Sequence, residues 1–81
     1  MNGNTNISDL FLTAYLITQG FKPIGRVVEG HNTLFQFKTS PELEKTIEQY
    51  YTGETSVNAA TFADKYRFVL NMVKSLRTAG R

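Results

Sequence analysis

The 81-residue chain contains no cysteine, two prolines, a single histidine and no long apolar run. Without cysteine neither a disulfide nor a thiolate metal site can form, so the core or a partner must stabilise this small domain. One histidine, His31, without a cluster of other ligands does not make a zinc site. No stretch approaches the roughly 20 apolar residues of a membrane-spanning helix. The first residues are polar and unlike a signal peptide, so we expect a cytoplasmic protein.

The net charge of the chain is small, but the acidic and basic residues are unevenly distributed along it. The formal net charge is +2, well short of the excess that marks a dedicated nucleic-acid protein. Four of the seven acidic residues lie together, and they are Glu42, Glu44, Glu48 and Glu54. Five of the nine basic residues gather near the C-terminus, and they are Lys65, Arg67, Lys74, Arg77 and Arg81. This pattern predicts an acidic middle helix and a basic C-terminal helix.

The first predicted element is a short apolar helix that follows a flexible tail over residues 1–7. Ser8 is a good N-cap for this helix. From Leu10 to Ile17 the chain is apolar except for one threonine, so the helix must be enclosed by the fold or shared with a partner. Gly20 predicts its end.

A β-hairpin is predicted next, with arms at about 22–29 and 33–39. In the second arm Phe35 and Phe37 alternate with other residues, so one face of the hairpin is aromatic. Because a bare two-stranded hairpin is not stable in water, we expect this aromatic face to be buried.

The register of the hairpin depends on the length of its turn. A three-residue turn at 30–32 places Val27 opposite Phe35, whereas a two- or four-residue turn places Arg26 there. We prefer the three-residue turn, since an arginine buried beside Phe35 would be costly. The other registers stay open.

Two more helices are predicted, over residues 41–52 and 59–78. Ser40 can cap the first of them, with Pro41 at its first helical position. Gly53 can take the left-handed conformation that ends it. The fold class is therefore α+β, in which one β-hairpin packs against three helices in the order α-β-β-α-α.

This fold occupies a single domain over residues 8–78, and residues 79–81 are expected to be a flexible end. Asn58 is a suitable cap for the last helix. No internal repeat is present.

Six short segments together form a recognisable pattern, and they are DLFLTAYL at 9–16, GF at 20–21, PEL at 41–43, YYTGE at 50–54, VNA at 57–59 and FA at 62–63. They resemble a family of short, uncharacterised phage and prophage proteins that is catalogued as a domain of unknown function. The resemblance covers residues 8 to about 77. It implies a phage or mobile-element origin, and hence the cytoplasm of a bacterial host, but it implies no activity and no functional residue.

No residue pattern indicates catalysis. His31 lies in the expected turn, with no acid or nucleophile placed beside it. None of the serines lies in a nucleophile-elbow pattern, and the glycines form no phosphate loop. Glu44 and Glu48 share a helix face, but a single acidic helix is better explained as a solvated surface than as a metal or acid–base site. We therefore expect no enzyme, no metal and no cofactor.

Two surfaces carry features of nucleic-acid binding. Phe35 and Phe37, with Arg26 and Lys38 nearby, resemble a small stacking platform, although burial of the two rings is the stronger interpretation. The basic helix is the better candidate, because cations seven residues apart lie near one line on a helix and can follow a phosphate backbone. A solvated helix face is the competing interpretation. The candidate contact residues are Lys65, Arg67, Lys74, Arg77 and Arg81.

A protein interface is the other candidate site. The first helix has more apolar residues than one helix face needs, which predicts contact with a partner or a two-fold dimer. Tyrosines can anchor an interface, although in a small domain they more often close the core. The candidate interface residues are Leu10, Phe11, Leu12, Tyr15, Tyr50 and Tyr51.

The leading hypothesis is a non-catalytic binding protein that contacts nucleic-acid phosphates through helix 59–78. The alternative is a protein–protein inhibitor or adaptor that acts on a host or phage factor, for example in counter-defence. A structural or self-associating role is a third. The separation of charge along the chain is compatible with all three.

Overall fold

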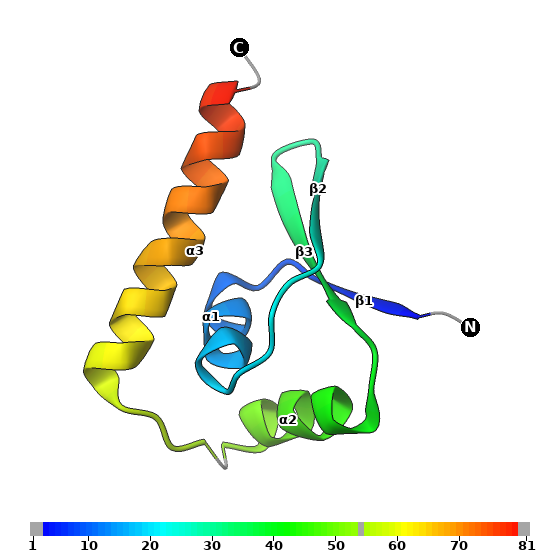
Figure 1. Ribbon diagram of the computed structural model, residues 1–81, viewed down its shortest axis with the longest axis vertical. Helices are drawn as coiled ribbons and strands as arrows, with labels where there is room; N and C mark the ends of the chain where they lie inside the picture. Colours follow the sequence, from blue (N-terminus) through cyan, green and yellow to red (C-terminus); the bar gives the residue numbers. More distant parts are fainter. Residues whose placement is uncertain (1–2, 54, 80–81) are drawn as a thin grey trace.

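The computed structural model describes residues 3–53 and 55–79, with side chains up to Lys74. Its elements are β1 (Asn4–Ile7), α1 (Leu10–Thr18), β2 (Gly25–Glu29), β3 (Asn32–Lys38), α2 (Pro41–Thr52) and α3 (Ala59–Ala79). They form a small α+β domain in which a three-stranded antiparallel sheet packs with three helices (Figure 1). The α+β class is confirmed, but the element order is β-α-β-β-α-α.

The additional element is β1, at a place where a flexible tail was expected over residues 1–7. β1 pairs antiparallel with β3, with Thr5 opposite Phe37. The pairing is extended by a hydrogen bond from the Thr39 amide to the Gly3 carbonyl oxygen (2.8 Å). Because Ile7 is buried in the core, β1 belongs to the folded domain, and the expectation of a tail is wrong for residues 4–7.

The strand order is β1-β3-β2, so β2 forms one edge of the sheet. Glu29 pairs with Asn32 across a two-residue turn, and this register puts Arg26, not Val27, opposite Phe35. The preferred three-residue turn is therefore wrong. Its rationale was that an arginine opposite Phe35 would be buried. In the structure Phe35 is fully buried, whereas Arg26 is exposed on the edge strand.

α1 begins at a different cap from the expected Ser8. The N-cap is Asp9, whose carboxylate accepts hydrogen bonds from two backbone amides of the first turn (2.9 and 3.2 Å). At the other end Gly20 has a φ of +102°, and the Phe21 amide donates to the Leu16 carbonyl oxygen (3.0 Å). This bond is the one that characterises a glycine-terminated helix, so Gly20 ends α1 as expected.

The predicted caps of the later helices are confirmed. The Ser40 hydroxyl oxygen accepts a hydrogen bond from the Leu43 amide (3.1 Å), and α2 begins at the following proline. Gly53, at a φ of +83°, ends α2 in the left-handed conformation. The Asn58 side chain accepts a bond from the Thr61 amide (3.0 Å) at the start of α3.

α1 lies at the centre of the domain, where it contacts α3, α2 and β1 (Figure 1). Phe35 and Phe37 are buried, as predicted, which argues against a stacking platform. The buried apolar residues are Ile7, Leu12, Ala14, Tyr15, Leu16, Phe35, Phe37, Leu43, Val69 and Val73. Within the described residues, every element except β2 contributes to this core.

Candidate binding surface

The basic residues predicted to contact nucleic acid do not all lie together. Arg67 and Lys74 are both exposed and, seven residues apart, share one side of α3. The Arg67 guanidinium donates to the Asp64 carboxylate, so part of its charge is already balanced within the helix. Lys65 is half-buried on a different flank of α3. The side chains of Arg77 and Arg81 lie outside the described residues.

The apolar residues of α1 are mostly enclosed within the chain. Leu12 and Tyr15 are buried, and Leu10 is half-buried against the core. Phe11 is exposed, but its ring stacks flat on the ring of Tyr66 in α3, with 4.7 Å between the ring centroids. Because α3, α2 and β1 surround α1, its composition no longer requires a dimer.

Tyr50 and Tyr51 form an aromatic cluster with Tyr15. The Tyr50 ring lies 5.5 Å from the Tyr15 ring and 5.3 Å from the Tyr51 ring. Burial raises the pKa of the Tyr50 hydroxyl above its ordinary value, and the negative charge of Asp9 acts in the same direction. Tyr50 therefore closes the core between α1 and α2, whereas Tyr51 remains exposed.

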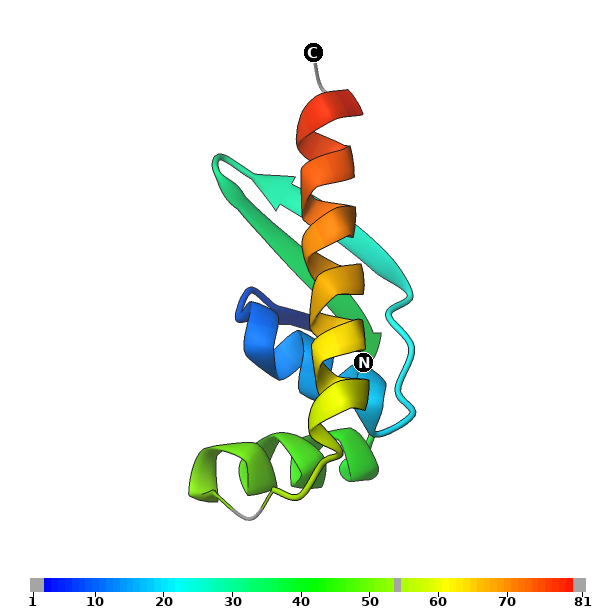
Figure 2. The same cartoon turned by 90° about the vertical axis from the view of Figure 1, so that its left-hand side faces the viewer.

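A hollow of about 240 Å³ lies between α3 and the start of β2. It is lined by Pro23, Ile24, Gly25, Arg26 and Met72. In Figure 2 the segment leading into β2 (cyan) runs along the side of α3 opposite the start of α1. The amide of Ile24 donates to the Gln36 carbonyl oxygen (2.7 Å), which fixes this segment to the sheet.

Exposed apolar side chains occur on both elements that flank the hollow, and of these Ile24 lines it directly. Ile24 is 58% exposed and Val28 is 55% exposed. On α3, Phe68 is 51% exposed and follows Lys65 at the spacing that puts both on the flank of Met72. We call this the β2–α3 surface, and its members are Lys22, Ile24, Arg26, Val28, Lys65, Phe68 and Met72.

The position of β2 explains why these side chains are exposed. Residues opposite each other in an antiparallel pair point to the same face, so Arg26 shares the face of Phe35, and Val28 shares the face of Thr33. That face is covered over β3, where Phe35 and Thr33 are buried, but it is open over β2. The second layer of the fold therefore stops short of the edge strand.

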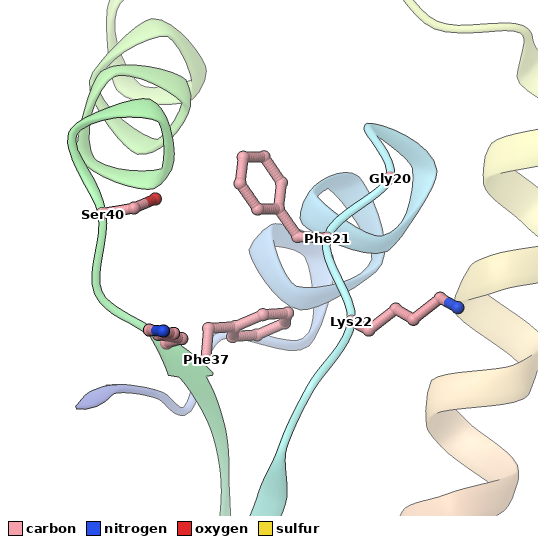
Figure 3. Close-up of a pocket in the computed structure, with 6 residues that line it drawn as sticks. Gly20, Phe21, Lys22, Phe37 and Ser40 are labelled. Carbon is pink, nitrogen blue, oxygen red and sulfur yellow. The ribbon is translucent and has the colours of Figure 1, made fainter. Parts of the chain in front are cut away.

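The β2–α3 surface is basic as well as apolar. Arg26 lines the hollow, and Lys22 extends toward α3 (Figure 3). Lys65 contributes a third cation, and no acidic residue lines the hollow. The surface therefore favours a ligand that is both apolar and negatively charged.

A second hollow, of about 350 Å³, lies on the other side of the segment before β2 (Figure 3). The rings of Phe21 and Phe37 form its walls, and Ser40 at its border is engaged as the cap of α2. An anion at the start of α2 would meet Glu42 and Glu44 in the first helical turn. Lys22 and Lys38 also line this hollow, so it is basic like the first, but it lacks the exposed apolar side chains of the β2–α3 surface.

The part of the chain that the structure describes contains neither a metal site nor a membrane-spanning helix. No group of three or more histidine, cysteine, aspartate or glutamate side chains is placed to hold a metal ion there. No helix in that part is both long and apolar enough to cross a membrane. His31 is exposed at the tip of the hairpin.

Sequence reasoning missed the β2–α3 surface, although two signals for it exist. Phe68 falls outside the apolar stripe that contains Val69 and Val73, so it has no place in the core. Ile24, Arg26 and Val28 alternate along the chain as residues of one strand face do. Neither signal shows that the two groups meet, because this depends on where α3 crosses the sheet.

The chain belongs to the family described as a domain of unknown function, DUF5659, whose sequence model matches residues 2–75. The match confirms the resemblance to an uncharacterised family that the sequence motifs indicated. Neither a curated protein nor a solved structure matches the chain. The family assignment names no activity, so the surface itself must support any functional proposal.

Proposed function

We propose that this protein is a non-catalytic binding module, an inhibitor or adaptor, that recognises an acidic protein partner through the β2–α3 surface. The observation that carries the proposal is the combination of exposed apolar side chains with Arg26 in the hollow and with Lys22 and Lys65 on the elements beside it. Contiguous exposed apolar surface bordered by polar groups is typical of protein interaction sites.

The magnitudes favour a protein partner over nucleic acid. Ile24, Val28 and Phe68 each keep about half of their surface free, so covering all three stabilises a complex by on the order of 3 kcal/mol. An exposed ion pair contributes only about 0–1 kcal/mol. The apolar contacts therefore supply most of the affinity. The cations then select for an acidic partner and accelerate its association.

Nucleic-acid binding is the second candidate, and it is favoured by the position of Arg67 and Lys74 on one side of α3. Two phosphate contacts predict a slope of only about −2 in log affinity against log salt concentration. Binding of this kind would be weak and independent of base sequence. The bond between Arg67 and Asp64 weakens it further.

Selection from a library of random peptides displayed on phage tests the proposal. We expect the wild-type protein to enrich peptides in which acidic and apolar residues are combined. The charge reversal Arg26→Glu should abolish this enrichment, because it repels acidic peptides. The matched control is Lys74→Glu, which makes the same change in net charge on an exposed residue outside the β2–α3 surface and should leave the enrichment unchanged.

Two results would contradict the proposal. One is enrichment that survives Arg26→Glu, and the other is the absence of any enriched acidic sequence. A parallel gel-shift assay with single- and double-stranded DNA and RNA at low salt tests the second candidate. A shift that Lys74→Ala abolishes and Arg26→Ala does not would put nucleic acid first.

A further inference from the structure

We propose that the partner binds by adding a strand to the free edge of β2, a mode that rests on the proposed function of the β2–α3 surface. β2 pairs with β3 on one side, and no other described strand pairs with it. An edge strand of this kind presents a row of backbone donors and acceptors to any chain that can pair with it.

The hairpin geometry identifies which backbone groups are free. In the two-residue turn, the carbonyl group of Glu29 and the amide of Asn32 form the hydrogen-bonded pair that closes the hairpin. Bonded and non-bonded pairs alternate in an antiparallel ladder. Arg26 and Val28 therefore direct their amide and carbonyl groups away from β3, toward the solvent side of the edge.

The side chains on this edge specify the sequence of the added strand. Arg26 and Val28 lie two residues apart in β2, so they present a basic and an apolar group on the helix side of the sheet, and Ile24, just before the strand, adds an apolar group that lines the same hollow. A complementary strand carries an apolar, an acidic and an apolar residue at alternate positions on that face. The chemistry of the partner is therefore an extended segment of the pattern apolar-x-acidic-x-apolar.

α3 completes the site from above the edge. Phe68 and Met72 lie on the flank of α3 that borders the hollow beside β2. A strand added about 4.8 Å beyond β2 would place its helix-side residues against this flank. The apolar residues of the partner would then cover Ile24 and Phe68, which the fold leaves exposed.

Charge argues against a second copy of the chain as the occupant. A two-fold axis near the middle of β2 would bring Arg26 of one copy close to Arg26 of the other. Juxtaposed like charges of this kind cost several kcal/mol. A charged residue on the inner face of an edge strand also opposes unspecific pairing, so Arg26 restricts addition to strands with an acidic residue opposite it.

The other edge of the sheet is a poorer docking site. β1 has four residues, and the side chains of Asn4 and Asn6 are polar and exposed. Its hydroxyl at Thr5 is already bonded to the hydroxyl of Thr39 (2.7 Å). β1 therefore lacks the exposed apolar residues that would stabilise an added strand.

A defined peptide tests the mode of binding. The probe is acetyl-Thr-Val-Thr-Glu-Thr-Val-Thr-amide, titrated to millimolar concentration into the isotopically labelled protein and followed by NMR. We expect shifts centred on β2 and slower hydrogen exchange of the Arg26 and Val28 amides. The same peptide with lysine in place of glutamate should bind at least about tenfold more weakly.

Backbone methylation separates strand addition from side-chain contact alone. One probe carries N-methyl groups on its valines and glutamate, and the other carries them on its threonines. An added strand uses only one of its two edges, so one probe should lose binding and the other should keep it. The probe that loses binding reports the direction of the added strand. The amides of the valines and glutamate bond to Arg26 and Val28 only in an antiparallel strand, whereas those of the threonines do so in a parallel one.

Two protein variants provide the matching test. Val28→Pro removes an amide that points away from β3, a position at which an edge strand tolerates proline. Val28→Thr shortens the apolar contact but keeps this amide. We expect Val28→Pro to abolish binding of the probe and Val28→Thr to weaken it only a few-fold, with circular dichroism confirming that both variants fold.

The outcomes separate this proposal from the proposed function. If acidic peptides bind but neither methylated probe loses affinity, strand addition is wrong and the binding function stands. The same conclusion holds if Val28→Pro binds as tightly as Val28→Thr. If neither the probe nor any library peptide binds, the proposed function fails together with it.

Discussion

Phe35 is the residue whose replacement tests the architecture most directly. Its ring is fully buried in the central strand, between Ile7 on β1 and Arg26 on β2. Truncation of such a ring to alanine costs about 3–5 kcal/mol, through lost transfer free energy and the cavity left behind. A domain of 81 residues has a free energy of unfolding of about 4–12 kcal/mol. We therefore expect Phe35→Ala to lose a quarter or more of its free energy of unfolding.

Urea unfolding followed by circular dichroism measures this effect. The matched control is Leu34→Ala, because Leu34 is the preceding residue in β3, points to the opposite face and is half-buried. It should cost about half as much as a core leucine, on the order of 1–2 kcal/mol. Equal costs for the two variants, or a loss below about 1 kcal/mol for Phe35→Ala, would refute the assignment of the helix-side face as the core.

Three further predictions concern the ends of the fold and its response to pH. Deletion of residues 1–6 removes most of β1 and should lower the melting temperature, whereas an unchanged value would support a flexible tail. Asp9→Ala removes the cap of α1 and should cost about 1 kcal/mol in urea unfolding, while Asp9→Asn should keep most of it. The raised pKa of Tyr50 means that its neutral form is favoured in the folded state. This contribution is present below the unfolded pKa of about 10 and is lost as the pH rises through the folded pKa. The free energy of unfolding of Tyr50→Phe should therefore fall less between pH 9 and 11 than that of the wild type, as measured by urea unfolding. Identical pH profiles for the two proteins would contradict a raised pKa at Tyr50.

The features that sequence reasoning predicted correctly are those with local causes. Ser40, Pro41 and Gly53 bracket α2, and its observed bounds agree with the predicted range 41–52. Asn58 marks the start of α3 in the same way. A cap satisfies backbone groups within the next few residues, so the information that defines it lies next to the helix end.

The features that were missed have distant causes. The segment Asn4–Ile7 has no strong strand propensity, and it becomes a strand because β3, about 30 residues later, offers an edge to pair with. The hairpin register was misjudged for a related reason. The cost of placing Arg26 opposite Phe35 depends on whether helices cover β2, which no local pattern reveals.

In the candidate site, too, features with local causes were predicted and features with distant causes were missed. The helical spacing of Arg67 and Lys74 could be read from the sequence, but the bond from Arg67 to Asp64 reduces its value as a phosphate contact. The apolar excess of α1 was correctly noticed, and its cause is enclosure by the fold. The β2–α3 surface depends on two elements that are 30 residues apart in the chain.

The packing of α1 against α3 joins the first helix of the chain to the last, and this has a consequence for synthesis on the ribosome. At about 5–20 residues per second, several seconds separate the synthesis of Leu16 from that of Val69. Throughout that interval the most apolar helix of the nascent chain has no α3 to cover it. We therefore expect the growing polypeptide to need chaperones that hold apolar segments, and we expect ribosome stalling before α3 to leave an intermediate prone to aggregation.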